Sequence, residues 1–140
     1  RADDKEVAFV WSTEHLYAGC PDLIGESGGL KVIADFKTSN APYMNTFPDK
    51  GDRMGFGGFR KYQKCAQQMA AYRKALAERT GYICDVALII VSTSETTQGI
   101  FIDTDQMDRF EDKFLKRCTQ FHLENGDEDT KSGSQQELSE

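Results

Sequence analysis

Two aspartates and a lysine are the residues of this chain best suited to chemistry. Asp35 and Lys37 lie in the apolar run Leu30–Thr38, and Asp22 lies one short hairpin upstream, directly after Pro21. Two neighbouring carboxylates suit a hard divalent ion such as Mg²⁺ or Mn²⁺, because such ions prefer carboxylate oxygens and retain waters. A metal beside a lysine is what phosphodiester hydrolysis needs, since the ion polarises the phosphate and lowers the pKa of a bound water.

Strand geometry predicts how these residues meet. Side chains alternate along a strand, so Asp35 and Lys37 point to one face, which we expect to be the open face at the strand's end. The alternate residues of the strand would face the other way, into the core, namely Val32, Ala34 and Phe36. If Gly28 and Gly29 form a two-residue turn, Asp22 lies directly opposite Asp35, with Cβ atoms ~4.5–5.5 Å apart.

This geometry suggests a role for each group of the cluster. Lys37 would neutralise developing charge and orient or deprotonate the attacking water, and the backbone carbonyl of Phe36 would be a further metal ligand. Opposed carboxylates repel, and one takes up a proton unless a cation lies between them. The alternative interpretation is a salt bridge between Lys37 and one acid on a solvated strand end. We favour the metal site because the turn, the apolar strand and the preceding Gly-x-Pro-Asp agree.

The net charge of −6 is concentrated at the C-terminal end. Residues 123–140 carry −5 and residues 1–122 only −1. The terminal segment is rich in Ser, Gly and Gln, so we expect a disordered acidic tail. The rest is long enough for one domain with a core, and it can bind DNA through local basic clusters. No apolar run approaches the ~18 residues of a membrane span, so no membrane partner is expected.

The cysteines do not form a metal-ligand pattern. No two of them make a CxxC pair, which zinc and iron–sulfur sites usually contain, so no iron–sulfur cluster is expected. We interpret them as reduced thiols of an intracellular protein. They are Cys20, Cys65, Cys84 and Cys118.

Three short strands and a long loop are expected around the acids. The strands cover residues 7–11, 16–26 and 30–38, and Pro21 makes the second an edge, a bulge or a break. Residues 40–58 contain two prolines and four glycines. A loop of this length is often functional in a compact domain, although a tolerated insertion would look the same.

The remaining elements alternate between helix and strand. Apolar residues at three- and four-residue steps predict a helix over 59–79, which Gly81 would end. The apolar segments 83–92 and 99–103 predict two more strands, and Thr104 would cap a last helix. The order β-β-β-loop-α-β-β-α predicts an α/β fold with a mixed central β-sheet flanked by helices.

Three motifs of the chain occur in a recognisable order. GCPDLIG at 19–25 and VIADFKTS at 32–39 precede QMAAY at 68–72, a Gln-x-x-x-Tyr motif on the next helix. Together they resemble the PD-(D/E)XK nuclease superfamily, specifically its RecB-type exonuclease branch. The sequence of these motifs and their order are similar to those of mitochondrial genome maintenance exonucleases and of phage or bacterial relatives. The similarity extends over roughly residues 14–122.

The resemblance implies a restriction-endonuclease-like core within residues 1–122. It implies that Asp22 and Asp35 are metal ligands and that Lys37 is the catalytic lysine. Gln68 and Tyr72 would support the site or touch DNA, and they lie on one helical face.

Two features of that branch are matched less closely. Glu14 matches an acid often found before the first motif, and is a candidate for a residue that contacts the metal ligands without binding the metal itself. The branch often adds a histidine from an N-terminal helix, which neither His15 nor His122 matches. The chain begins at Arg1 rather than at a methionine. We therefore expect either that the N-terminal helices are missing here or that the metal is held without histidine.

Basic residues interleaved with aromatic ones favour single-stranded DNA or DNA ends as the partner, because charges follow phosphates and rings stack on bases. Arg60, Lys61 and Lys64 begin the long helix, and the preceding loop adds Lys50, Arg53, Phe47 and Phe56. The alternative is a solvated helix face with a few core phenylalanines. No base-reading motif is present, so little sequence specificity is expected.

The sequence therefore predicts a Mg²⁺- or Mn²⁺-dependent DNA exonuclease that hydrolyses phosphodiester bonds from DNA ends. The alternative is a catalytically inactive nucleic-acid-binding or assembly module with the same fold. There is neither a GxGxxG motif nor a P-loop to suggest a nucleotide-binding enzyme. The compartment is open between a mitochondrion and a phage-infected or bacterial cytoplasm, and without a transit peptide in view we favour the latter.

Overall fold

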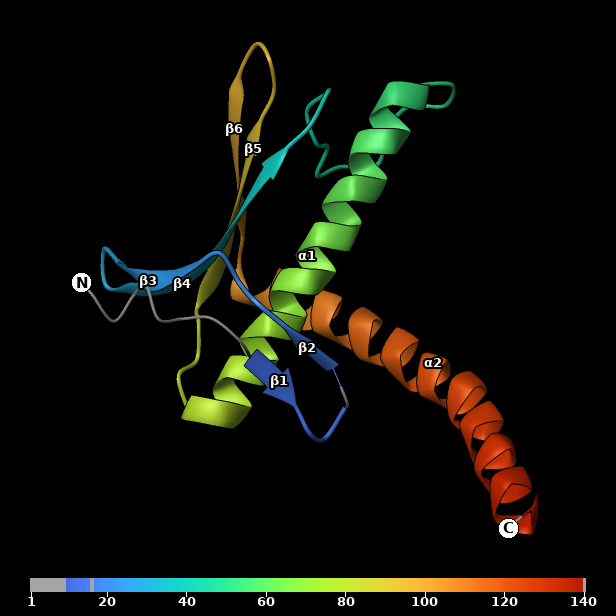
Figure 1. The fold of residues 1–140 in the computed structure, drawn as a ribbon. Helices are drawn as coiled ribbons and strands as arrows, with labels where there is room; N and C mark the ends of the chain where they lie inside the picture. Colours follow the sequence, from blue (N-terminus) through green and yellow to red (C-terminus); the bar gives the residue numbers. More distant parts are fainter. Residues whose placement is uncertain (1–9, 16, 140) are drawn as a thin grey trace.

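The computed structural model describes residues 10–15 and 17–139, and side chains up to Asn125 except that of Trp11. Residues 7–9 and Leu16, predicted to lie in strands, are outside the described residues. The elements are β1 (Val10–Ser12), β2 (Tyr17–Gly19), β3 (Leu23–Ser27), β4 (Leu30–Thr38), α1 (Arg53–Thr80), β5 (Val86–Ser92), β6 (Thr97–Ile102) and α2 (Thr104–Ser139), drawn in Figure 1. The α/β class and the mixed sheet are confirmed.

The main sheet has four strands in the order β3-β4-β5-β6, and β1 and β2 form a separate antiparallel pair. β4 and β5 are parallel, whereas β3 pairs with β4 and β6 with β5 in the antiparallel sense. The parallel pair requires a crossover connection, which α1 provides. In Figure 1, α1 runs along one face of this sheet.

The β3–β4 hairpin has the predicted register. Ser27 pairs with Leu30, and both turn residues have positive φ, 59° at Gly28 and 82° at Gly29. Two positive φ values are the requirement of a type I′ turn, which glycine meets without strain. The segment over 16–26, for which Pro21 predicted an edge, a bulge or a break, is divided into β2 and β3, since Pro21 removes a ladder donor between them.

Helix α1 begins earlier than the sequence predicted. Its cap is Asp52, whose Oδ1 accepts from the Gly55 N–H at 2.8 Å. Glycines lower helix propensity by ~1 kcal/mol each, which is why this stretch was predicted to be loop. At one of these positions a glycine is required for lack of space, because a Cβ at Gly58 would lie 2.6 Å from the Pro42 carbonyl oxygen. The helix ends as predicted, at Gly81 with φ 77°.

Helix α2 is capped by Asp103 rather than by Thr104. The Asp103 Oδ1 accepts from the Gln106 N–H at 2.8 Å, and Gln106 Oε1 accepts from the Asp103 N–H at 3.2 Å. This reciprocal pair is a capping box with Asp in place of Ser or Thr. The Thr104 hydroxyl instead donates to the Asp85 carbonyl at 2.5 Å.

The backbone of α2 stays helical through Ser139, across the segment predicted to be a disordered acidic tail. In Figure 1 this part of α2 extends away from the sheet. A helix without tertiary packing is marginal in water, and disorder of residues 123–140 stays a prediction. Over the described residues, neither α1 nor α2 has a stretch with the length and hydropathy of a membrane-crossing helix.

The core lies between α1 and one face of the sheet, and this face is the opposite of the predicted one. Ile33 is fully buried and Asp35 is 5% exposed, whereas Phe36 on the other face is 52% exposed. The predicted alternation is right, but the prediction of an open Asp35 face was wrong. The reason is that α1 covers this face and places Cys65 against Asp35. Asp35 is therefore a buried carboxyl group.

Candidate active site

The hairpin brings the two aspartates together as the register predicted. Leu23 pairs with Ala34, so the next opposed residues are Asp22 and Asp35. The Asp22 Oδ2 accepts a hydrogen bond from the Phe36 N–H at 2.9 Å, and the two carboxyl groups also hydrogen-bond to each other. The carboxyl groups of two strands therefore meet at the end of the hairpin.

The backbone of Phe36 is released from the ladder by Pro21. The same register sets Phe36 opposite Pro21, which has no N–H to donate. The N–H and C=O of one strand residue point to the same neighbour. Because the Phe36 N–H points to Asp22, its carbonyl points to the same side and has no ladder donor there. Proline before the first aspartate thus leaves a backbone oxygen available beside the acids.

The two carboxyl groups have opposite pKa shifts. Burial, and then the hydrogen bond with Asp22, raises the pKa of Asp35 above its ordinary value. The hydrogen bond with Asp35, followed by the Phe36 N–H, lowers the pKa of Asp22 despite some burial. Opposite shifts mean that the pair keeps its last proton to a higher pH than an isolated carboxyl group does. A cation between the carboxylates would replace that proton.

Lys37 is a charged partner of this pair. Its Nζ lies 2.9 Å from Asp35 Oδ2, in an ion pair whose Asp35 side chain is buried and whose Lys37 side chain is partly exposed to solvent. Burial would lower the pKa of Lys37, but the hydrogen bond and the charge of Asp35 outweigh burial and raise it. Lys37 is therefore an ammonium group suited to stabilising negative charge. This geometry supports the predicted charge-neutralising role over deprotonation of water by Lys37.

A buried thiol lies on the inner side of Asp35, a contact that was not predicted from the sequence. Cys65 Sγ is 3.6 Å from Asp35 Oδ2. Burial, and then the charge of Asp35, raises the pKa of Cys65 to about 12. The thiol therefore stays protonated and acts as a weak donor to the carboxyl group.

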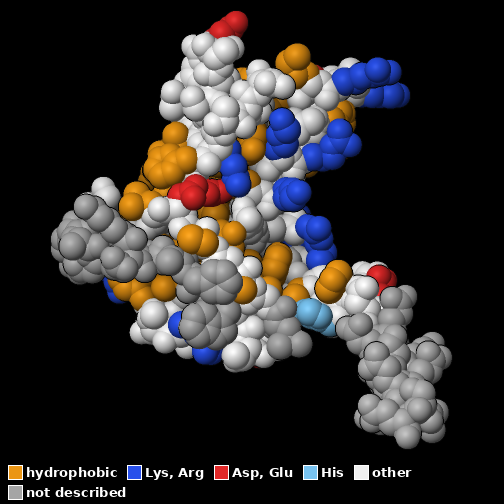
Figure 2. Space-filling model, viewed as in Figure 1, with side chains coloured by type: hydrophobic (Ala, Val, Ile, Leu, Met, Phe, Trp, Pro, Cys, Tyr) orange, Lys and Arg blue, Asp and Glu red, His pale blue; other side chains and the backbone are white. Residues whose placement is uncertain are grey.

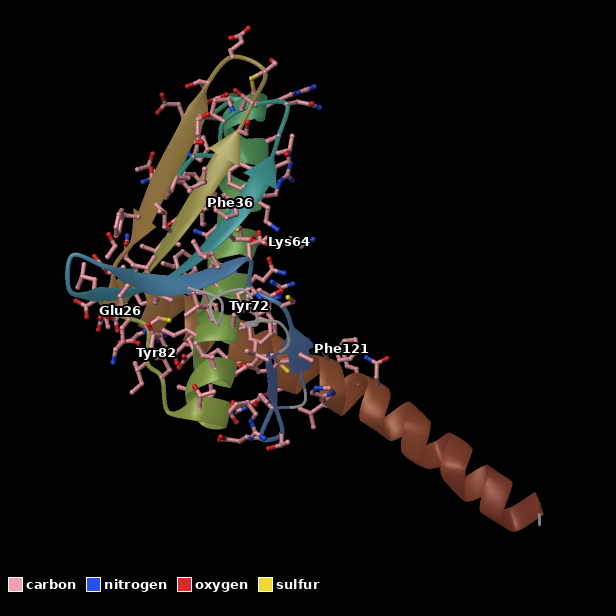
Figure 3. The ribbon with its side chains drawn as sticks, turned by 60° about the vertical axis from the view of Figure 1, so that its left-hand side comes forward. Glu26, Phe36, Lys64, Tyr72, Tyr82 and Phe121 are labelled. Carbon is pink, nitrogen blue, oxygen red and sulfur yellow. The ribbon has the colours of Figure 1, made fainter. Side chains whose placement is uncertain are left out.

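The Gln-x-x-x-Tyr pair braces the segment that carries Asp22. Gln68 Nε2 donates to the Tyr72 hydroxyl at 2.8 Å, and the same hydroxyl hydrogen-bonds to the Cys20 backbone. Tyr72 also packs directly under Gly19, where a Cβ would lie 2.1 Å from the ring atom Cε1. Figure 3 labels Tyr72 on α1. The pair therefore fixes the backbone two residues before Asp22.

The donor set fits a hard divalent ion bound by few protein ligands. Among the described residues, no group of three or more His, Cys, Asp or Glu side chains could hold a metal. Two carboxylates and a carbonyl oxygen remain, from Asp22, Asp35 and Phe36. Mg²⁺ is commonly held by one or two carboxylates and keeps several waters. Oxygen-only ligands select Mg²⁺ or Mn²⁺ over zinc.

A cleft of about 860 Å³ adjoins Lys37 and is lined by residues of both α1 and α2. Its floor and walls come from β2, β4, the following loop and both helices. The lining residues are Tyr17, Lys37, Thr38, Tyr43, Lys61, Lys64, Cys65, Gln67, Gln68, Phe114, Arg117, Cys118, Phe121 and His122. Figure 2 shows Lys and Arg side chains in a row along α1 and acidic side chains beside a basic one near the centre of this face.

Some of the predicted DNA-contacting residues line this cleft and others do not. Lys61, Lys64 and Gln68 line it, and Lys61 Nζ also reaches Ser39 Oγ at 3.3 Å. Arg60 is exposed on α1 but is not among the lining residues. The role expected for Glu14 finds no support, because its Oε1 pairs with His15 Nε2 at 3.3 Å in the β1–β2 turn. It is also absent from the groups that shift the pKa values of the two aspartates.

Comparisons with known proteins assign this chain to no family. No family model matches this chain, and no curated protein matches it. Among solved structures, one similar chain is described as the crystal structure of SSO0001, at 13% identity and a TM-score of 0.42. The match covers 79% of this chain and 48% of that one, so this chain spans about half the length of that structure.

Proposed function

We propose that this chain is a divalent-metal-dependent DNA exonuclease. The observation that carries the proposal is the opposed pair Asp22 and Asp35 at the end of the hairpin, with the Lys37 Nζ 2.9 Å from Asp35 Oδ2. Opposed carboxylates repel each other, so a sheet gains no stability from this pairing unless a cation lies between them. A pair with displaced pKa values beside a cleft is a candidate functional site.

The protein groups of this site would divide the work as follows. Asp22, Asp35 and the Phe36 carbonyl would hold Mg²⁺ or Mn²⁺, which would supply phosphate polarisation and a bound water of lowered pKa. Both carboxyl groups must be ionised to act as ligands. Lys37, held 2.9 Å from Asp35, stabilises the negative charge that develops on the phosphate oxygens. Gln68 and Tyr72 keep the Asp22 segment in place.

DNA ends, single-stranded ones in particular, are the proposed substrate. The basic cleft beside Lys37 supports an unpaired strand, since its cations and aromatic rings suit phosphates and bases. Action from ends follows from the resemblance of the three motifs. The four cysteines are free thiols, which supports a reducing compartment such as a bacterial or phage-infected cytoplasm, or a mitochondrion.

The test is cleavage of single-stranded oligonucleotides labelled at one end or the other. The wild-type protein should shorten them with Mg²⁺ or Mn²⁺ and not with EDTA. Asp35→Asn should reduce cleavage to background, and Lys37→Ala should reduce the rate by about 10²–10³. Glu26→Gln is the matched control, since Glu26 is an exposed acid of the same hairpin (labelled in Figure 3). The proposal fails if wild type shows no metal-dependent cleavage or if Asp35→Asn retains it.

A catalytically inactive nucleic-acid-binding module is the second candidate. It is favoured by the lack of a third acidic or histidine ligand near Asp22 and Asp35 among the described residues. In that case the protein would bind oligonucleotide equally well with Mg²⁺ and EDTA and leave it intact. The cleavage assay above separates the two candidates.

A further inference from the structure

Helix α2 forms a wall of the cleft for which the sequence assigned no role. Arg117 and Phe121 lie four residues apart on α2 and both line the cleft, as do the α1 residues Lys61 and Lys64. Residues four apart share one helical face. In Figure 3, Lys64 on α1 and Phe121 on α2 lie on the same side of the molecule. The cleft therefore has a basic residue on each wall.

Arg117 is held in place by a buried group. Its Nη1 donates to Gln67 Oε1 at 3.0 Å, and Gln67 is only 8% exposed. This contact orients the guanidinium without neutralising it, because an amide carries no charge. The remaining donors of Arg117 keep the fork geometry that suits phosphate oxygens.

Phe121 is an aromatic ring presented at the cleft rather than in the core. It is 59% exposed, and its ring lies 5.4 Å from the His122 ring in an edge-to-face arrangement. Deeper in the cleft, Tyr17 and Phe114 pack edge to face with centroids 4.9 Å apart. An exposed aromatic ring among cations suits stacking on an unpaired base.

The charge and the size of the cleft both point to a single strand. Its lining includes four cationic side chains and no acidic one, although the chain carries a net charge of −6. Clustered cations in an acidic protein select a polyanion locally. A volume of about 860 Å³ lies in the range of small-molecule pockets, so it suits a few unpaired nucleotides rather than a double helix.

We propose that Arg117 and Phe121 of α2 clamp single-stranded DNA against the lysines of α1. Phosphates lie between Arg117 and Lys61 or Lys64, and a base stacks on Phe121. This proposal rests on the proposed function in one respect, namely that the bound DNA strand runs toward Lys37. It adds that α2 is a substrate-binding element of the domain.

Binding is measured by fluorescence anisotropy of a labelled oligothymidylate in EDTA, so that no cleavage occurs. Phe121→Ala should weaken binding about fivefold or more, as loss of one stacking contact does, and Phe121→Trp should restore it. Arg117→Ala should weaken binding and lower the slope of log K against log salt by about 0.7, as loss of one phosphate contact on a single strand does.

The matched control is Lys116→Ala, which removes an equal charge from the neighbouring position. Lys116 lines a separate shallow depression on the other side of α2, so this variant should bind like wild type. Far-ultraviolet circular dichroism checks that each variant is folded. A duplex of the same length should bind more weakly than the single strand, and its binding should respond less to Phe121→Ala.

The proposal is overturned if Arg117→Ala and Phe121→Ala bind like Lys116→Ala, or if duplex and single strand bind alike with the same response to Phe121→Ala. It is also overturned if wild type binds no single strand in EDTA. A wild-type protein that shows the predicted binding pattern but no cleavage with Mg²⁺ contradicts the nuclease proposal and supports the clamp. The two proposals therefore fail on different observations.

Discussion

Gly19→Ala is the substitution whose consequence follows most directly from the packing. The new Cβ would lie 2.1 Å from Tyr72 Cε1 and 2.8 Å from the hydroxyl oxygen. Ordinary contacts between carbon atoms are ~3.5–4.0 Å, so the ring or the strand must move by more than an ångström. The ring is not free to move, because its hydroxyl is held by Gln68 and by the Cys20 backbone.

The expected loss of stability has two parts. Overpacking a well-packed site costs about 1–3 kcal/mol, and the loss of one neutral hydrogen bond at the Tyr72 hydroxyl costs about 1 kcal/mol more. Gly19→Ala should therefore lower the free energy of unfolding by about 2–4 kcal/mol. Since Cys20 moves with the ring, the position of Asp22 and the affinity for Mg²⁺ should suffer as well.

Urea denaturation of four variants tests this reasoning. Gly25→Ala is the matched control in β3, where a Cβ meets nothing within 4 Å, and it should be neutral or stabilise by about 0.5 kcal/mol. In a Tyr72→Leu background the ring is gone, so adding Gly19→Ala should cost little, and the double-mutant cycle isolates the contact. The reasoning is refuted if Gly19→Ala is as mild as Gly25→Ala, or if its cost is unchanged without the ring.

Three further predictions concern charges and caps. Arg73→Ala should destabilise by about 3 kcal/mol in urea denaturation, because the buried Arg73 joins α1 to Glu111 of α2 at 3.2 Å, and a loss under 1 kcal/mol would contradict this. Burial raises the pKa of Asp35, so its ionisation weakens the fold. In EDTA, thermal stability should fall as pH rises from the ordinary carboxyl pKa through the raised one, and Asp35→Asn should be the more stable protein above that range. An Asp35→Asn melting temperature below that of wild type there would refute this. Asp103→Ala should cost about 1 kcal/mol by removing the cap on Gln106, and an unchanged urea midpoint would refute it.

The hairpin and its acids were predictable from the sequence because local chemistry determines them. Two adjacent glycines demand a two-residue turn, and an apolar run before Asp35 demands a strand. Together they fix a register in which Asp22 must meet Asp35. The core face of α1 was predictable for the same reason, since Tyr62, Met69 and Leu76 recur at helical steps and are buried.

The exposure of the acids was not predictable, because alternation along β4 gives two faces without saying which one α1 covers. Of the predicted core residues Val32, Ala34 and Phe36, only Ala34 is buried, because α1 packs over Ile33 and Asp35. The start of α1 was not predicted because the glycines of its first turns have low helix propensity, although Asp52 caps the helix there. The role of α2 in lining the cleft was not predicted, because the sequence alone does not distinguish Arg117 and Phe121 from other surface residues. Only the packing of α2 beside α1 places them in the cleft.

Calorimetric titration with Mn²⁺ tests the central claim most directly. Wild type should bind one ion and release a proton to the buffer below the raised pKa of Asp35, because the aspartates share a proton that the ion displaces. Asp22→Asn and Asp35→Asn should abolish this binding, and Glu26→Gln should retain it. Binding that survives both aspartate substitutions, or no binding by wild type, would contradict a metal site between the two strands.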